Sequence, residues 1–211
     1  MTKSIYDQLN AKGTIAKQRM VEDFSGWQLD PERWGSIVKI TGTSGAAAMN
    51  DTNDGGVKVS TGTNDEAMLA FDDIRQFDYT SCGFVSVSRT TCSNIAHGQN
   101  RTGIKYDNDG TFNGGDLISM ECGYNNQKIS LFTGSASGYE RTTSSIDRDT
   151  VYHSYKGLIS GGVATLTIDG VLECTTNTHL PTKRMQPFIY NASSATASSA
   201  ETRYLEVFNI W

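Results

Sequence analysis

A few carboxylates are the first residues in this chain to test for chemistry. Hydrolysis of a glycosidic bond needs two carboxyl groups roughly 5–10 Å apart, one acting as acid and one as nucleophile or base. Glu121 lies in a strand-like run, but no acidic residue stands two positions away, where it would share the same face. Asp72 and Asp73 are adjacent, so in a strand they would point to opposite faces. The pattern predicts no catalytic pair.

The histidines give no better catalytic signal. His153 lies in a strand-like run, where a packed or surface histidine is expected, and His97 and His179 lie in expected loops. No Gly-x-Ser-x-Gly motif, which would expose a serine nucleophile on a sharp turn, is present. We therefore predict no catalytic residue, and that the protein is not an enzyme.

Two acidic turns could hold calcium, the one cofactor that the sequence suggests. A hard cation prefers several oxygen ligands from a compact loop. The oxygen-bearing side chains of these turns are those of Asp51, Asn53, Asp54, Asp107 and Asp109. Asp and Asn also favour turns for purely local reasons, so a simple turn explains the same residues.

One turn has the composition of a sugar-binding site. Such sites combine an aromatic platform with a few polar groups. Tyr124, Asn125, Asn126 and Gln127 have these properties and lie between two expected strands, and three further tyrosines could extend the surface: Tyr139, Tyr152 and Tyr155. The alternative is that Asn125-Asn126 is an ordinary hairpin turn.

Composition excludes several classes of partner. The chain has 211 residues, with 18 Lys+Arg against 23 Asp+Glu, and the basic residues form no run. Binding of nucleic acid through its phosphates is therefore not expected. No apolar segment approaches the roughly 20 residues that span a bilayer, so no membrane insertion is expected.

The four cysteines are Cys82, Cys92, Cys122 and Cys174, and their spacing fits no zinc motif. Cys122 and Cys174 fall inside strand-like runs, which indicates buried free thiols. We predict that all four are reduced, with a Cys82–Cys92 disulfide as the alternative.

The elements that must position these residues read as β-strands. Short apolar or alternating runs are separated by clusters of Gly, Asn, Asp and Ser, and no helix of ordinary length interrupts them. Asp169-Gly170 and Asn108-Asp109-Gly110 have the composition of tight hairpin turns. The expected strands are 36–41, 56–60, 66–71, 82–89, 117–123, 127–133, 152–160, 163–169, 185–190 and 203–211. This series predicts an all-β fold of packed antiparallel sheets.

Two segments stand apart from the strands. The sequence of residues 1–20 predicts a short helical arm, which either caps the sandwich or serves in docking or oligomerisation. Residues 21–211 are expected to form one β-sandwich domain. The run from Asn191 to Ala200 consists of small, mostly polar residues and is expected to be a long surface loop.

Two segments, one at each end of this domain, have a recognisable pattern. Near the start the segment is Glu22-Asp23-Phe24-Ser25-Gly26-Trp27-Gln28-Leu29-Asp30-Pro31-Glu32-Arg33-Trp34. Near the end, Ile168-Asp169-Gly170 is followed by Leu180-Pro181, by Met185-Gln186-Pro187-Phe188 and by a final strand ending at Trp211. In pattern and order these segments resemble concanavalin A-like lectin/glucanase and laminin-G-like domains. The resemblance implies a two-sheet jelly roll with one concave sheet, shared by lectins, glycosidases, adhesion modules and viral structural proteins.

The resemblance also bears on the candidate sites. Glucanases of this superfamily often carry Glu-x-Asp-x-x-Glu on one strand, and that string is absent here. Lectins of the superfamily often hold calcium beside a sugar, which would suit the acidic turns. Trp27, Trp34 and Trp211 are expected to be core or edge packing residues.

Together these features predict a non-enzymatic virion or phage structural protein, such as a capsid decoration, head-fibre or receptor-contacting subunit. The first residues, Met1 to Asn10, lack the apolar core of a signal peptide, so we expect assembly in the host cytoplasm and localisation in the virion. The alternative is a protein that stays in the cytoplasm or is exported by a non-classical route. The expected partners are copies of itself, capsid or tail proteins and a cell-surface glycan. The alternatives are a stand-alone carbohydrate-binding module or, further off, a divergent glycoside hydrolase.

Overall fold

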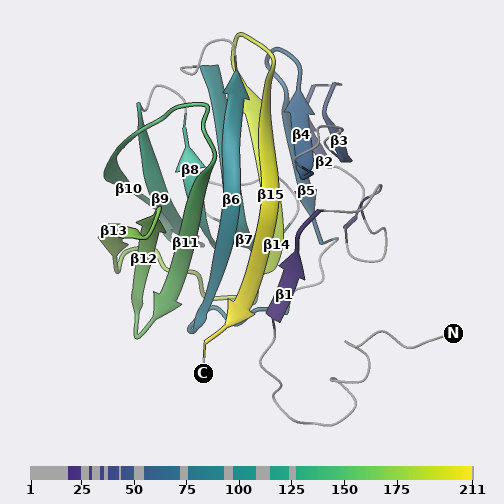
Figure 1. Ribbon diagram of the computed structural model, residues 1–211. Helices are drawn as coiled ribbons and strands as arrows, with labels where there is room; N and C mark the ends of the chain where they lie inside the picture. Colours follow the sequence, from purple (N-terminus) through teal and green to yellow (C-terminus); the bar gives the residue numbers. More distant parts are fainter. Residues whose placement is uncertain are drawn as a thin grey trace, which may run out of the picture.

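The protein is a sandwich of two antiparallel β-sheets, which lie one behind the other in Figure 1. The structure is a computed structural model that describes residues 19–24, 29, 34–35, 38–42, 44–49, 55–71, 76–92, 97–107, 115–123 and 127–210. Within these ranges, no helix is long and apolar enough to cross a bilayer. The predicted all-β, two-sheet antiparallel sandwich is confirmed.

Sheet A has the order β13-β12-β11-β6-β15-β4-β3. Its strands are β13 (Val171–Thr176), β12 (Val163–Ile168), β11 (His153–Ser160), β6 (Cys82–Cys92), β15 (Ser198–Asn209), β4 (Val57–Thr61) and β3 (Ala46–Met49). One edge of the long β15 pairs with β6 along its whole length, while β4 and β1 (Arg19–Glu22) share its other edge. The first and last described strands of the chain therefore lie side by side.

Sheet B has the order β10-β9-β8-β7-β14-β5-β2. Its strands are β10 (Gly138–Asp147), β9 (Lys128–Ser135), β8 (Leu117–Cys122), β7 (Gly98–Lys105), β14 (Gln186–Ser193), β5 (Glu66–Ala70) and β2 (Val38–Thr41). Every residue of β7, β8 and β14 is buried, so the centre of sheet B is covered on both faces.

The core lies between the two sheets. Alternate residues of facing strands meet there, among them Val59 of β4, Phe84 of β6, Ile104 of β7 and Leu131 of β9. Trp34 closes one part of it against Phe71, with ring centroids 4.8 Å apart in an edge-to-face arrangement, and this confirms its predicted packing role. Trp27 and Trp211 lie outside the described residues.

All ten expected strands are present, with ends shifted by a few residues. The hairpin at Asp169-Gly170 is confirmed: both residues have positive φ, 48° and 86°, and the turn joins β12 to β13. The hairpin expected at 108–110 and residues 1–18 of the helical arm expected at 1–20 lie outside the described residues. The arm is wrong at its end, because Arg19 and Met20 begin the strand β1, which pairs with β15.

The segment from Asn191 to Ala200 forms the predicted surface loop only at residues 194–197, and the prediction is wrong at both of its ends. Its first three residues end β14 and its last three begin β15, and all six are buried. The side-chain amide of Asn191 donates to Thr61 Oγ1 at 2.8 Å and to the carbonyl oxygen of Ser198 at 2.9 Å. Such polar side chains tolerate burial because neighbouring strands satisfy their hydrogen bonds.

Free thiols are confirmed at three of the four cysteines. Cys82, Cys122 and Cys174 are buried and unpaired. The alternative Cys82–Cys92 disulfide is wrong, because these residues are the two ends of the eleven-residue strand β6. At about 3.3 Å per residue, their Cα atoms lie much farther apart than the 7 Å that a disulfide allows.

Candidate functional site

The outer face of sheet B carries a buried carboxylate held by two arginines. Glu121 on β8 is fully buried and accepts hydrogen bonds from Gln99 and Arg101 of β7 at 2.7 and 3.2 Å. Arg141 of β10 donates to both carboxylate oxygens, from Nε at 3.0 Å and from Nη2 at 2.7 Å. We call Gln99, Arg101, Glu121 and Arg141 the Glu121 cluster.

The register of sheet B places these residues together. Arg101 stands directly opposite Glu121 in the β7–β8 pair, so their side chains share one face. Burial alone would raise the pKa of Glu121, but the charges of Arg101 and Arg141 and their hydrogen bonds outweigh it and hold the pKa below its usual value. Glu121 is therefore a stable anion rather than a proton donor near neutral pH.

The sequence expectation for Glu121 as a lone strand carboxylate is confirmed for its own strand. Ser119 and Gly123 stand two positions away on β8 and just beyond it. A Cβ on Gly123 would lie 2.5 Å from Glu121 Oε1, so a glycine is required there to leave room for the carboxylate. Asp72 and Asp73 lie outside the described residues.

An exposed aromatic ring lies beside the Glu121 cluster. Tyr139 on the edge strand β10 stands opposite Gly134 of β9, and this leaves its ring free to reach the diagonal neighbour Phe132. The two rings stack with centroids 5.3 Å apart and an interplanar angle of 15°. Phe132 is fully buried, whereas Tyr139 is 46% exposed.

Phe132 also connects this ring to the arginines. The guanidinium of Arg101 lies 4.2 Å from the Phe132 centroid, and that of Arg141 lies 5.8 Å from it. Both distances are within the range of cation–π attraction. Tyr139 and Arg141 thus form an exposed rim whose positions are fixed from beneath by Phe132 and Glu121. We call Tyr139 and Arg141 the β10 rim.

The predicted sugar-binding turn is described only in part. Gln127 is exposed and its backbone carbonyl accepts a hydrogen bond from the amide of Arg148 at 2.7 Å, whereas Tyr124, Asn125 and Asn126 lie outside the described residues. That site stays a prediction. The three added tyrosines do not form one surface: Tyr155 is in the core, Tyr139 is on sheet B and Tyr152 contacts sheet A.

The predicted calcium ligands are also mostly undescribed. Asp107 pairs with the buried Lys105, with Oδ1 and Nζ 2.7 Å apart, while Asp51, Asn53, Asp54 and Asp109 lie outside the described residues. Among the residues that the structure does describe, no three His, Cys, Asp or Glu side chains are grouped as metal ligands. The calcium site stays a prediction.

The histidines lie where the sequence places them. His153 begins β11, and its ring nitrogens contact Asp169 at 2.5 Å and Asp149 at 3.1 Å. Burial would lower the pKa of His153, but hydrogen bonds to these two carboxylates raise it above its usual value. His97 and His179 lie outside the strands. The two carboxylates hold His153 in place, and no serine or cysteine nucleophile is bonded to it among the described contacts.

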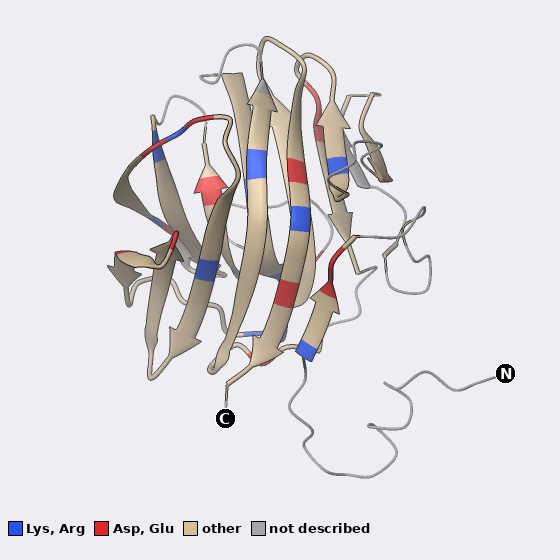
Figure 2. Ribbon diagram, in the orientation of Figure 1, with Lys and Arg blue, Asp and Glu red and all other residues tan. Residues whose placement is uncertain are grey.

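A second buried carboxylate lies on the outer face of sheet A, where basic and acidic residues alternate across β4, β15 and β6 (Figure 2). Glu201 on β15 accepts hydrogen bonds from Arg89 at 2.7 and 2.9 Å, from Thr91 at 3.1 Å and from the Tyr152 hydroxyl at 3.1 Å. Lys58 Nζ lies 3.8 Å from it. We call these five residues the Glu201 cluster.

A β-bulge completes this second cluster. The register of β15 against β6 shifts between Thr202 and Tyr204, which leaves Arg203 as the extra residue. A bulge re-aims the side chain it carries. The Arg203 guanidinium lies 3.8 Å from the Tyr152 ring centroid, and that of Arg89 lies 4.5 Å from it.

Sequence reasoning missed the arginines and lysine of both clusters. Arg101 and Arg141 fall in the strands β7 and β10, which were not expected because their apolar residues are few. The available signal was the two-residue spacing of Tyr139, Arg141 and Thr143, which places all three on one face of a strand.

No protein-family model and no curated protein matches this chain. Solved structures do match. Bacillus licheniformis beta-glucanase is similar with a TM-score of 0.63 and 15% identity, over 92% of this chain and 98% of that one. The Emp47p carbohydrate recognition domain is similar with a TM-score of 0.65 and 11% identity, over 90% of this chain and 94% of that one. A beta-1,3-1,4-glucanase from a mouse hindgut metagenome is similar with a TM-score of 0.65 and 14% identity, over 92% of this chain and 100% of that one.

The prediction that the protein is not an enzyme is wrong as it stands. It rested on missing motifs, and the solved structures that match nearly the whole chain include glucanases. A carbohydrate recognition domain matches equally well, so the fold by itself leaves enzymatic status open. At these identities the likeness concerns architecture, and the fold is that of the concanavalin A-like jelly-roll proteins.

Proposed function

We propose that the protein binds carbohydrate at the β10 rim. The observation that carries the proposal is the Tyr139 ring, nearly half exposed and held flat against Phe132 beside Arg141. A sugar ring presents an apolar face and a polar edge. Tyr139 supplies an apolar platform for the first, and Arg141 supplies donors for the second.

The geometry keeps the cost of binding low. A side chain that must be ordered on binding loses about 0.5–1.5 kcal/mol of affinity. Tyr139 is already ordered by stacking, and Arg141 by its two hydrogen bonds to Glu121. Those bonds use Nε and Nη2, so the Nη1 donors are not engaged by Glu121.

The structural neighbours support the same substrate class. The solved structures that match are glucanases and a carbohydrate recognition domain, and both kinds of protein bind sugars. A lectin-like role and a hydrolytic role share the step of glycan binding, and this shared step is the function proposed.

A glycan array followed by titration of the best ligand tests this function. We expect binding in the micromolar-to-millimolar range, about tenfold weaker for Tyr139→Ala and little changed for Tyr139→Phe, which keeps the ring. Tyr79→Ala is the matched control, because Tyr79 is 36% exposed and no ring contact is described for it. A blank array at high protein concentration, or equal affinity of wild type and Tyr139→Ala, would refute the proposal.

A hydrolysis assay then separates binding from catalysis. The bound glycan is incubated with wild-type protein and with Glu121→Gln, and released reducing ends are measured. Product from the wild type alone, with Glu121→Gln shown by circular dichroism to be folded at the assay temperature, would assign the chemistry to the Glu121 cluster. Unchanged glycan from both would identify a binding protein.

The more specific expectation of a virion structural subunit stays a prediction. Its test is the native mass by light scattering behind a sizing column. A closed trimer or larger assembly is expected, and a stable monomer would contradict it.

A further inference from the structure

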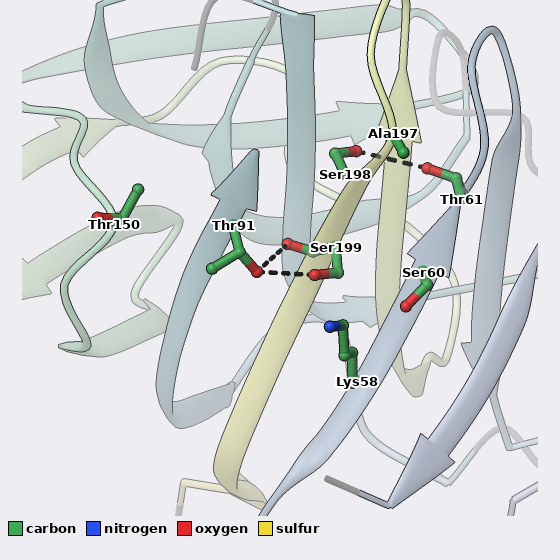
Figure 3. Close-up of a pocket in the computed structure, with 8 residues that line it drawn as sticks. All are labelled: Lys58, Ser60, Thr61, Thr91, Thr150, Ala197, Ser198 and Ser199. Atoms are coloured by element: carbon green, nitrogen blue, oxygen red, sulfur yellow. Dashed lines mark hydrogen bonds between the residues drawn. The ribbon is translucent and has the colours of Figure 1, made fainter. Parts of the chain in front are cut away.

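An open pocket lies on the outer face of sheet A, away from the β10 rim. Its volume is about 520 Å³, within the usual size of a site for a small molecule. It is lined by Lys58, Ser60, Thr61, Thr91, Thr150, Ala197, Ser198 and Ser199. Figure 3 shows that most of these side chains come from the three neighbouring strands β4, β15 and β6.

The sheet register sets hydroxyl groups in a row across this pocket. Ser60 of β4 stands opposite Ser199 of β15, which stands opposite Thr91 of β6. Side chains of directly paired residues point to the same face, so these three hydroxyls share the outer face. The next row in the same register is Lys58, Glu201 and Arg89.

The direction of the hydrogen bonds follows from the charge of Glu201. Burial would raise the pKa of Glu201, but the hydrogen bonds and charge of Arg89 hold it below its usual value, so the carboxylate can only accept. Thr91 therefore donates to Glu201 at 3.1 Å. Ser199 donates to Thr91 at 2.7 Å, a contact drawn in Figure 3. Ser199 Oγ is left with lone pairs to accept a hydroxyl from a ligand.

A buried amide supports the strands behind the pocket. Asn191 is fully buried and its Nδ2 donates to Thr61 Oγ1 at 2.8 Å and to Ser198 Oγ at 3.1 Å. Ser198 Oγ in turn donates to the carbonyl of Ala192 at 3.0 Å. Because successive strand residues point to opposite faces, these side chains point inward and fix the positions of β4 and β15, which carry Ser60 and Ser199 on the outer face.

The charge of the pocket favours an anion. Arg89 approaches Glu201 to 2.7 Å and largely neutralises it, whereas Lys58 lies 3.8 Å from the same carboxylate. The Lys58 side chain is 43% exposed and lines the pocket. Two cations, Lys58 and Arg89, thus share the single carboxylate of Glu201, so this group of side chains carries a net positive charge beside the pocket.

We propose that this pocket binds a hexuronic acid, a sugar ring that bears a carboxylate. The carboxylate pairs with Lys58, and a ring hydroxyl donates to Ser199 Oγ. A neutral sugar lacks the group that Lys58 attracts, and an inorganic anion lacks the hydroxyl that Ser199 accepts. The proposal uses no residue of the β10 rim, so its test is independent of the test of the function proposed there.

Protein-observed NMR titration with glucuronate at low ionic strength tests this site. Wild type is expected to bind in the millimolar range, with Lys58→Met about two- to fivefold weaker, as expected for a partly exposed ion pair. Ser199→Ala should also weaken binding. Lys156→Met is the matched control, because Lys156 is exposed on β11 of the same sheet and does not line the pocket. A thermal melt of each variant confirms that it is folded.

Two further ligands show whether binding needs both the carboxylate and the sugar ring. Methyl glucoside should bind more weakly than glucuronate, and sulfate should not match glucuronate in affinity. Equal binding of sulfate and glucuronate would reduce the site to a simple anion site and overturn the proposal. So would glucuronate binding that Tyr139→Ala abolishes and Lys58→Met leaves unchanged.

Discussion

The two sheets each bury one glutamate on their outer face, yet the two carboxylates sit in different surroundings. In the Glu121 cluster the carboxylate is fully buried, and its partner Arg101 is only 5% exposed. In the Glu201 cluster the partners Arg89 and Lys58 are 31% and 43% exposed. Both glutamates are anionic, but only Glu121 has a cationic partner that water hardly reaches, because Arg101 is buried while its second partner Arg141 is 36% exposed.

The difference in exposure of the cationic partners indicates what each cluster does in the molecule. Two charges that are removed from water lose hydration free energy, and their attraction offsets this loss only when several hydrogen bonds join them. The four bonds to Glu121 meet that need and make the cluster a rigid support for Tyr139 and Arg141. The Glu201 cluster, beside an open pocket, keeps charge available to a ligand.

Removing the negative charge of either glutamate gives the largest predicted difference in stability between the two clusters. Glu121→Gln leaves Arg101 buried without its counter-charge and should lower the free energy of unfolding by about 3–5 kcal/mol. Glu201→Gln should cost about 1–2 kcal/mol, because water can solvate the exposed parts of its partners. Urea denaturation of both variants at neutral pH measures the difference. Equal losses would remove the contrast between the clusters.

The pH dependence sharpens the comparison. The pKa of Glu121 in the folded protein lies below the 4.5 of a free glutamate, so its stabilisation is present above pH 4.5 and is lost as pH falls through the folded value. The stability gap between wild type and Glu121→Gln should therefore narrow below pH 4.5. The pKa of Glu201 is also lowered, so its contribution changes with pH in the same direction. A gap that widens in acid would contradict this assignment.

Raising the salt concentration should have the smallest effect on the stability of the variants. It should still distinguish the water-exposed ion pairs of the Glu201 cluster from the buried pair of Glu121 and Arg101. Ion pairs reached by water are screened at high ionic strength, whereas buried pairs are screened much less. In 1 M NaCl the loss from Glu201→Gln should shrink by about 0.5 kcal/mol, and the loss from Glu121→Gln should hardly change. Glu206→Gln is a useful reference, because its partner Arg19 is 61% exposed. Equal salt sensitivity of Glu121→Gln and Glu206→Gln would show that the Glu121 cluster is open to water.

Much of the fold could be predicted because local signals agree with it. Alternation in Val163–Ile168 and the Asp169-Gly170 turn fix β12 and its hairpin without reference to the rest of the chain. Strands β7 and β10 escaped prediction for the opposite reason. Their buried or paired residues are largely polar, as at Arg101 and Arg141, and only the neighbouring strands explain why such side chains belong in a sheet.

The candidate sites were less predictable for the same physical reason. Glu121 was recognised as a strand carboxylate, but its partners come from β7 and β10, each about twenty residues away in the chain. The sheet register, not the local sequence, decides which residues stand opposite one another. Likewise, Ser198 and Ser199 read as loop residues until β4 and β6 are placed beside them.

The most direct test of carbohydrate binding at the β10 rim is an amide NMR titration with the best array glycan. We predict that the largest shift changes fall on residues 138–143, around Tyr139 and Arg141, with Tyr139→Ala abolishing them at the same glycan concentration. Shift changes confined to the Lys58 pocket, or none at saturating glycan, would contradict the proposed site.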